Sequence, residues 1–300
     1  MNLLVGRFEH IIENEPMSRH TTFRTGGPAR WFCPVTSVSD IHAVIAFARE
    51  SGKPLYVIGR GSNLLVSDKG IDGVVMEIAD GFRDIRVDGE RIIAEAGSSL
   101  SAVAARARDE GLAGMAFASG IPGTLGGGIS MNAGAYGGEM KDIVETVQVL
   151  DLADPDNTIR TFSNEDMHFS YRNSRCHKEP LLILGATLKL NSGNREEIAE
   201  EMRELNSRRR EKQPLEYPSA GSTFKRPEGH FAGKLIQDAG LRGYSVGDAE
   251  VSEKHCGFVI NKGNATSDDI YRLIRHVEEE VKRAFGVQLE TEVRLLGEFE

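Results

Sequence analysis

The stretch SGIPGTLGGGISMNAGAYGG, residues 119–138, decides how this sequence is interpreted. Nine glycines lie between Gly114 and Gly138, and ordering so many glycines in a mere connector would cost a large amount of conformational entropy. Apolar residues within the stretch can anchor it to a core. We therefore expect the backbone here to approach a flat or anionic ligand closely. A mobile connecting loop is the alternative.

The first glycine loop of the chain, GRGSNLL at residues 59–65, directly follows a strand-like run. Glycine permits a positive φ and lets a ligand reach the main-chain N–H groups, which together form an anion-binding nest. Ser62 and Asn63 add side-chain donors, so the loop suits a pyrophosphate. The spacing is not G-x-G-x-x-G and no helix follows, which argues against a Rossmann site. An ordinary turn with two glycines would explain the same residues.

The motif FSYRNSR, residues 169–175, places two arginines among hydroxyl and amide side chains. Arg172 can hold a carboxylate through two parallel hydrogen bonds, which a lysine cannot do. A surface ion pair is an equally ordinary use of such an arginine.

Two segments toward the C-terminus carry further candidate groups. In SAGSTFKRP, residues 219–227, Ser222 lies among small residues and precedes two cations, a pattern that suits phosphate binding. Ser222 lacks the G-x-S-x-G context of a nucleophile elbow, and a turn serine is the alternative. In ETEVR, residues 290–294, Glu290 and Glu292 would share one face of a strand. A carboxylate there could donate a proton or remain a solvated edge charge.

The rest of the chain alternates helix and strand patterns, typical of an α+β or mixed α/β protein. Helices are predicted after Ser37 or Ser39 up to Gly52, over residues 100–110, from Asn194-x-x-Glu197 to near Pro214, near 231–239, and around 270–281. Strands are predicted at 55–59, 74–78, 144–152, 181–190, 257–261 and 289–297. The dipeptide Asp88-Gly89 predicts a two-residue hairpin. The helix after Asn194 leads toward a second domain.

The composition is typical of a globular protein of 300 residues. The formal net charge is -9, from Lys+Arg 36 and Asp+Glu 45. This balance argues against non-specific nucleic-acid binding. No run approaches the roughly 20 apolar residues of a membrane span, and the N-terminal stretch lacks the pattern of a signal peptide, so we expect a cytoplasmic protein. Cys33, Cys176 and Cys256 have no metal-ligand spacing and are predicted to be free thiols.

Seven segments together resemble the UDP-N-acetylenolpyruvoylglucosamine reductases, also called UDP-N-acetylmuramate dehydrogenases. They are TTFRTGGPA, VIGRGSNLLV, GIPGTLGGGISMNAGAYG, FSYRNS, AGSTFKRP, HCGFVINKGNAT and LETEVRLLG. They occur in the family's order and span nearly the whole chain. The resemblance implies a two-lobed FAD-binding domain of the vanillyl-alcohol-oxidase/PCMH type over residues 1–194, with lobes about 1–79 and 80–194. A smaller α+β substrate-binding domain would follow over 195–300.

The resemblance also implies roles for individual residues. Arg172 and Glu292 match the family's active-site arginine and glutamate, and Ser222 matches its proton donor. The residues implied to contact the substrate are Tyr171, Lys212, Arg226 and His255. The residues implied to cradle the cofactor are Gly59, Arg60, Gly61, Ser62, Asn63, Leu64, Gly120, Ile121, Pro122, Gly123, Gly126, Gly127, Asn132, Ala133 and Gly134.

The implied reaction uses NADPH and non-covalently bound FAD, and it needs no metal. The enolpyruvyl group of UDP-N-acetylglucosamine enolpyruvate would be reduced to the lactyl ether of UDP-N-acetylmuramate, a step of peptidoglycan precursor synthesis. About fifty residues separate Arg172 from Ser222, which leaves little room for the tyrosine-bearing insertion of one subclass. We therefore expect the shorter subclass.

Two other functions remain as alternatives. The first is another FAD-dependent oxidase or dehydrogenase of the same flavoprotein group. Several of these attach flavin covalently to a histidine in the first glycine loop, where this chain has Gly61-Ser62-Asn63. The second is a non-catalytic module that binds a UDP-sugar or a flavin, and the set of serine, arginine and glutamate argues against it.

Overall fold

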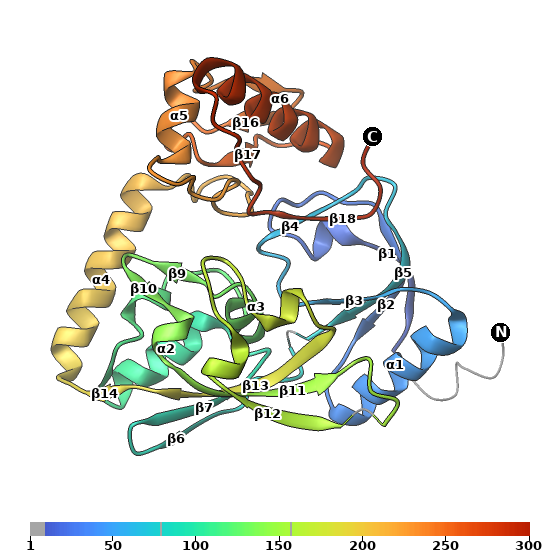
Figure 1. Cartoon of the computed structure of the whole chain (residues 1–300), viewed down its shortest axis with the longest axis vertical. Coiled ribbons are helices and arrows are strands. Elements are labelled where there is room, and N and C mark those ends of the chain that lie inside the picture. The colour runs from blue at the N-terminus through green and yellow to red at the C-terminus, as the bar shows by residue number, and fades with distance from the viewer. Residues whose placement is uncertain (1–9, 79, 157) are drawn as a thin grey trace. The chain divides into compact units, whose positions relative to one another are not determined.

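The computed structural model describes residues 10–78, 80–156 and 158–300 (Figure 1). The expectation that the chain lacks a signal peptide rests on its first residues, and residues 1–9 lie outside the described part. None of the described helices is long and apolar enough to cross a bilayer.

The chain forms two compact units, each assembled from separate stretches of sequence. Unit 1 consists mainly of Cys33–Arg60 and Val75–Arg209. Unit 2 consists of Ile12–Phe32, Gly61–Val74 and Arg210–Glu300. Strands β2 (Pro28–Pro34) and β5 (Ile71–Glu77) and helix α4 (Arg195–Lys212) run from one unit into the other. The strand order β1-β2-β5-β3 includes β1 (Ile12–Pro16) and β3 (Leu55–Ile58).

A five-stranded antiparallel sheet is the centre of unit 1, in the order β12-β11-β13-β7-β6. Its strands are β6 (Ile85–Asp88), β7 (Arg91–Glu95), β11 (Val144–Asp151), β12 (Ile159–Ser163) and β13 (Leu181–Lys189). Helices α2 (Leu100–Asp109) and α3 (Leu125–Ser130) pack against β7 (Figure 1). Fully buried side chains such as Val147 and Leu188 form the core of this sheet. Two short pairs, β8 (Leu112–Ala113) with β14 (Asn191–Ser192) and β9 (Gly134–Ala135) with β10 (Gly138–Glu139), complete the unit.

The predicted helix ends of unit 1 are confirmed. Ser37 accepts a hydrogen bond from the Asp40 N–H at the start of α1 (Val38–Ser51), and Gly52 ends this helix with a φ of 64°. Ser99 caps α2 in the same manner. Side-chain oxygens satisfy N–H groups that have no partner within the helix, and glycine tolerates the left-handed conformation at the other end.

The predicted β6–β7 hairpin is present, with a turn one residue later than expected. Asp88 pairs with Arg91, so the two loop residues are Gly89 and Glu90 rather than Asp88 and Gly89. Gly89 has a φ of 57°. Glycine at the first loop position is characteristic of a type II′ turn, whose twist matches that of the flanking strands.

Unit 2 is built on a small antiparallel sheet that helix α6 (Ser267–Phe285) covers (Figure 1). Its strands are β15 (Ser245–Val246), β16 (Ala249–Val251) and β17 (Val259–Asn261), and α5 (Ala232–Asp238) lies against α6. The apolar face predicted for α6 is confirmed, since Ile270, Leu273, Ile274, Val277 and Val281 are all buried. Phe23 and Leu65, from early in the sequence, belong to the same core.

The predicted C-terminal strand over 289–297 is shorter than expected. Strand β18 (Arg294–Leu296) pairs in parallel with β4 (Leu64–Val66). Before it, Thr291 makes only an isolated bridge with Phe224. The extended chain thus changes its pairing partner near Val293, which interrupts the regular ladder.

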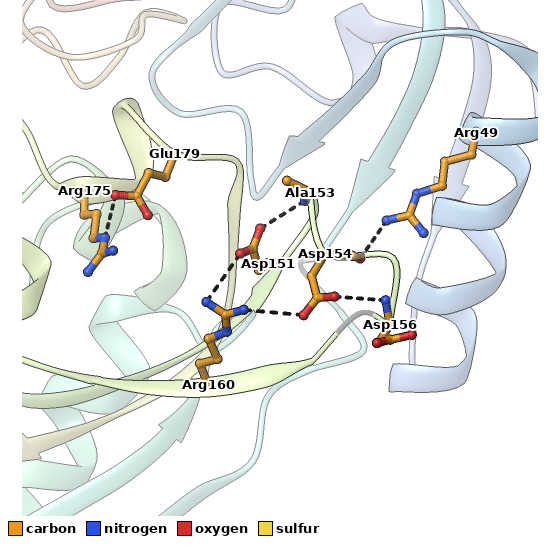
Figure 2. A network of polar contacts seen from close by, with 8 residues as sticks. All are labelled: Arg49, Asp151, Ala153, Asp154, Asp156, Arg160, Arg175 and Glu179. Carbon is orange, nitrogen blue, oxygen red and sulfur yellow. Dashed lines mark hydrogen bonds and ion pairs between the residues drawn. The ribbon is translucent and has the colours of Figure 1, made fainter.

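An ion-pair network holds the connection between β11 and β12 in unit 1 (Figure 2). Arg160 contacts Asp151 at 3.7 Å and Asp154 at 3.5 Å. Arg49 of α1 donates to the main-chain carbonyl of Asp154 at 2.9 Å. Because the Arg160 side chain is 49% exposed, each of its ion pairs contributes little free energy, and the network mainly fixes the conformation of residues 151–156.

Candidate active site

In unit 2, the first glycine loop presents unused main-chain donors. Gly61 has a φ of 58°, and a Cβ atom there would lie 1.9 Å from the His20 carbonyl oxygen, so only glycine fits. Within the described part of the chain, the N–H groups of Gly61, Ser62 and Asn63 donate to no acceptor. The buried hydroxyl groups of Thr22, whose N–H donates to the Gly61 carbonyl, and of Thr25 also have no partner. These donors fit an anionic group such as the pyrophosphate of FAD.

In unit 1, most main-chain N–H groups of the second glycine-rich stretch, residues 119–138, donate to other groups of the same unit. Thr124 caps α3 by accepting from the Gly127 N–H, and the Gly126 N–H donates to the Ala96 carbonyl at 2.9 Å. A Cβ atom at Gly126 would lie 3.0 Å from the Ala96 Cβ atom. Gly126 thus serves close packing of α3, and the N–H groups of Gly126 and Gly127 are not available to a ligand. Gly59, the first residue of the first glycine loop, is equally confined, because its Cβ would lie 2.5 Å from the Thr124 Oγ1 atom.

Gly120 of the GIPG segment lies against the end of helix α4. A Cβ atom at Gly120 would lie 2.5 Å from Asn206 Oδ1 and 3.0 Å from Arg209 Cδ. Asn206 donates to Ser119 Oγ at 3.1 Å. Burial lowers the pKa of Arg209, and no carboxylate among the described residues lies within salt-bridge distance of it. Sequence reasoning missed this cation, since it stands in the run SRRREK, which resembles a solvated helix face.

Arg172 lies at the tip of a tight hairpin. Ser170 and Asn173 exchange two main-chain hydrogen bonds of 3.1 Å, which leaves Tyr171 and Arg172 as the two loop residues. Arg172 has a φ of 52°, a conformation that disfavours any residue with a Cβ. Its Nη2 atom donates to the Gly134 carbonyl at 3.1 Å, and its guanidinium lies 4.9 Å from the centre of the Tyr171 ring. Backbone strain of this kind often occurs at functional sites.

The structure therefore brings four predicted residues of unit 1 together: Tyr171, Arg172, Asn132 and Gly134. Asn132 is fully buried, and its side chain donates to the Ser170 carbonyl at 3.0 Å. Ala133 follows it, and its N–H donates to the Gly128 carbonyl. The carboxamide of Asn132 thus serves the protein itself rather than a ligand.

In unit 2, Ser222 and Glu292 belong to neighbouring segments that are joined through Thr223. The Glu292 N–H donates to the Thr223 carbonyl at 2.8 Å. The Thr223 N–H donates to the Gly257 carbonyl, and the Thr223 hydroxyl accepts from the Val259 N–H, both at 2.9 Å. Ser222 itself is exposed. Buried Thr223 thus fixes the main chain on one side of Ser222, and the Ser222 side chain remains exposed.

The neighbouring carboxylate Glu290 has a different environment from Glu292. Glu290 is exposed and forms an ion pair of 3.1 Å with Lys225. Glu292 is half-buried, and the Asn63 side chain donates to its carbonyl. Of the two glutamates, Glu292 is the one whose main chain is hydrogen-bonded to the first glycine loop.

Three predicted substrate-binding residues also lie in unit 2. His255 is half-buried, and burial lowers its pKa. Its Nδ1 atom accepts from the Gly257 N–H, which leaves the proton of a neutral ring on Nε2. The guanidinium of Arg226 lies 4.0 Å from the ring centre of Phe231, which is 63% exposed. Lys212 ends helix α4 and is exposed.

Comparison with known proteins decides among the three functions considered above. A model of the UDP-N-acetylenolpyruvoylglucosamine reductase C-terminal domain matches residues 213–296, and a model of an FAD binding domain matches residues 29–163. A protein of Caldanaerobacter subterraneus subsp. tengcongensis named UDP-N-acetylenolpyruvoylglucosamine reductase is 52% identical, over 99% of both chains. This chain belongs to the UDP-N-acetylenolpyruvoylglucosamine reductase family.

Other members of the reductase family agree with this assignment. A reductase of Agathobacter rectalis is 51% identical, over 96% of this chain and 95% of its own. The crystal structure of the reductase from Thermus caldophilus covers 96% of this chain with a TM-score of 0.81 and 34% identity. The predicted fold, an FAD-binding domain followed by the C-terminal domain of this reductase family, is confirmed.

Proposed function

We propose that this chain is an NADPH-dependent flavoenzyme that reduces UDP-N-acetylglucosamine enolpyruvate to UDP-N-acetylmuramate during peptidoglycan precursor synthesis. Full-length similarity to reductases of this family supports the overall reaction. The structural observation that carries the proposal is the main-chain bond between Glu292 and Thr223, which joins the segment of the glutamate to that of Ser222.

FAD, when bound, would supply the hydride-transfer chemistry between NADPH and the enolpyruvyl double bond. The unused N–H groups of Gly61, Ser62 and Asn63 would hold its pyrophosphate. The Asn132 carboxamide is bonded within the protein. The other predicted cradle residues that would line the cofactor are Gly59, Arg60, Leu64, Gly120, Ile121, Pro122, Gly123, Gly126, Gly127, Ala133 and Gly134.

Arg172 would bind the carboxylate of the enolpyruvyl group. Negative charge grows on that carboxylate as the double bond is reduced, and a fixed guanidinium stabilises such charge more in the transition state than in the ground state. The hairpin fixes the main chain of Arg172, and the Gly134 carbonyl holds its Nη2 atom. The geometry therefore suits a group that must be in place before the reaction begins.

Ser222 would deliver a proton to the carbon next to the carboxylate, and Glu292 would stabilise the same developing charge. A general acid must reach the reacting atom, and the exposed hydroxyl of Ser222 meets this requirement. The roles of Tyr171, Lys212, Arg226 and His255 in substrate binding stay predictions. So do the shorter subclass and the domain boundary at residue 194.

The visible spectrum of the purified protein tests the proposed function. We expect a flavin spectrum that bleaches on anaerobic addition of NADPH and returns when UDP-N-acetylglucosamine enolpyruvate is added. A protein that lacks flavin, or a reduced flavin that this substrate does not reoxidise, would contradict the proposal. Acid precipitation should release the flavin into the supernatant, since the first glycine loop contains no histidine.

A further inference from the structure

A buried carboxamide, that of Asn132, holds the base of the hairpin that carries Arg172. Asn132 Nδ2 donates both to the Ser170 carbonyl at 3.0 Å and to Glu139 Oε2 at 3.1 Å. Its Oδ1 atom accepts from the Lys141 N–H at 2.9 Å. Both donors of the amide are therefore used, and Asn132 itself has a φ of 43°. An amide that is fully buried and fully bonded has one defined orientation.

Glu139 connects this amide to the charge of Arg172. Its carboxylate forms an ion pair of 2.8 Å with Lys141 and is only 22% exposed. Burial alone would raise the pKa of Glu139, but hydrogen bonds from Lys141 and Asn132, together with the charges of Lys141 and Arg172, lower it overall. The carboxylate thus remains charged near Arg172.

Strand pairing brings the same elements together. Glu139 in β10 pairs with Gly134 in β9, and the Gly134 carbonyl accepts the bond from Arg172. A Cβ atom at Gly134 would lie 2.6 Å from the Gly138 carbonyl, so the two strands lie too close for a side chain there. The hairpin tip and the carboxylate are thus fixed to one small β-ribbon.

We propose that Asn132 and Glu139 are positioning residues for Arg172. Asn132 fixes the base of the hairpin through Ser170, and Glu139 supplies the negative charge that holds the guanidinium against the β9–β10 ribbon. Neither side chain needs to touch the substrate. The inference rests on the proposed function, in which Arg172 binds the carboxylate of the substrate.

The variants Asn132→Asp and Glu139→Gln test this inference. Asn132→Asp keeps the size of the side chain and its tolerance of positive φ but removes both donors. Glu139→Gln keeps an acceptor and removes the charge. In stopped-flow experiments on the flavin-loaded protein, we expect each variant to slow reoxidation by the substrate about tenfold or more. Each should also weaken substrate binding, while reduction by NADPH changes less than about twofold, because Arg172 acts only on the substrate.

A double-mutant cycle separates positioning from a general loss of structure. In an Arg172→Lys background, Asn132→Asp should slow reoxidation by less than about twofold further, because a residue that acts through Arg172 has nothing left to position. The control Glu145→Gln breaks an exposed ion pair with Arg91 elsewhere in unit 1 and should change neither half-reaction.

Three results would overturn the inference. Slowing of the same size in both backgrounds would show that Asn132 acts independently of Arg172. Normal reoxidation in Glu139→Gln would show that the charge of Glu139 does not hold Arg172 in place. Glu139→Gln is the milder variant, and it keeps the inference testable if Asn132→Asp folds poorly. Normal turnover of Arg172→Lys alone would instead overturn the role of Arg172 in the proposed function, and the inference with it.

Discussion

Asn63 and Glu292 are joined by a hydrogen bond of 3.0 Å, from the side-chain amide of Asn63 to the main-chain carbonyl of Glu292. The Asn63 carbonyl accepts a second bond, from the Arg294 N–H at 2.9 Å. The two bonds lie on either side of Val293 and start the parallel pairing of β4 with β18. A residue that the sequence predicts as a cofactor ligand thus also fixes the segment of the proposed active-site glutamate.

The variant Asn63→Ala tests this double role. It leaves the half-buried Glu292 carbonyl without its donor, which we expect to lower the free energy of unfolding by about 1–2 kcal/mol. It should also slow reoxidation by the substrate, because Glu292 loses its support. Chemical denaturation and stopped-flow absorbance measure the two effects. Ser62→Ala is the control, and its unfolding free energy should change by less than about 0.5 kcal/mol. A stable Asn63→Ala protein with normal reoxidation would show that the bond is dispensable.

Gly61→Ala should purify with little or no flavin. Its Cβ atom would collide with the His20 carbonyl and distort the loop whose N–H groups would bind the pyrophosphate. Gly89→Ala is a matched control, because Gly89 has nearly the same φ and nothing within 4 Å of its Cβ position. That control should lose only about 1 kcal/mol of stability and keep its flavin. The ratio of flavin to protein absorbance measures the outcome, and equal ratios in the two variants would exclude the loop from cofactor binding.

Arg172→Lys should lose most of its substrate-dependent turnover while it retains flavin. The charge is kept, but the planar pair of donors that matches a carboxylate is lost. Arg175→Lys is the control three residues later, since Arg175 forms an ion pair with Glu179 (Figure 2) and packs on Phe162. Steady-state assays should show near-normal turnover for that control. Similar activity in the two variants would refute a special role for Arg172.

Ser222→Ala should separate the two half-reactions. A proton donor for the substrate plays no part when NADPH reduces the flavin, so that rate should be almost unchanged. Reoxidation by the substrate should slow by at least the ~10²-fold typical of a lost general acid. Ser222→Cys keeps an acidic hydrogen and should retain part of the activity, and Ser219→Ala is the control in the same segment. Equal slowing of both half-reactions would make Ser222 a structural residue.

All three cysteines should titrate as thiols after denaturation without a reductant, whereas the native protein should react slowly. Burial raises the pKa of Cys33 to about 12, and it also raises the pKa values of Cys176 and Cys256. The thiolate is the reactive form, so little of it exists at pH 8 in the folded protein. Fewer than three thiols after denaturation would reveal a disulfide, and fast labelling of the native protein would contradict the burial.

The elements that sequence predicts correctly are those with strong local signals. Ser37, Ser99 and Asn194 begin helices because their side chains satisfy the first N–H groups, and this chemistry is local. Helix α3 was missed, because three glycines in six residues are a poor helix signal. Close packing of α3 within unit 1 and the N-terminal cap from Thr124 outweigh the low helix propensity of these glycines. The pairing of Phe224 with Thr291 is equally invisible to local rules, because its partners lie far apart in sequence.

For the candidate site, the sequence proposes residues, whereas the structure shows which groups their side chains contact. Resemblance to the family selected Asn132 as a cofactor ligand, but its side chain is bonded entirely to protein groups. Glu139 and Arg209 went unnoticed, since a lone carboxylate and one arginine in a basic run have no distinctive pattern. Burial gives such residues their significance, and burial depends on contacts that no short segment encodes.

The core of unit 2 has a consequence for how the protein is made. Phe23 and Leu65 pack in that core with residues of α6, and Asn261 donates to the Phe23 carbonyl across 238 positions of the chain. During translation these two apolar side chains leave the ribosome long before their partners exist. They must stay exposed, or be sheltered by a chaperone, until synthesis is almost finished. The segment 213–296 expressed alone would lack both side chains, and it should therefore aggregate rather than fold.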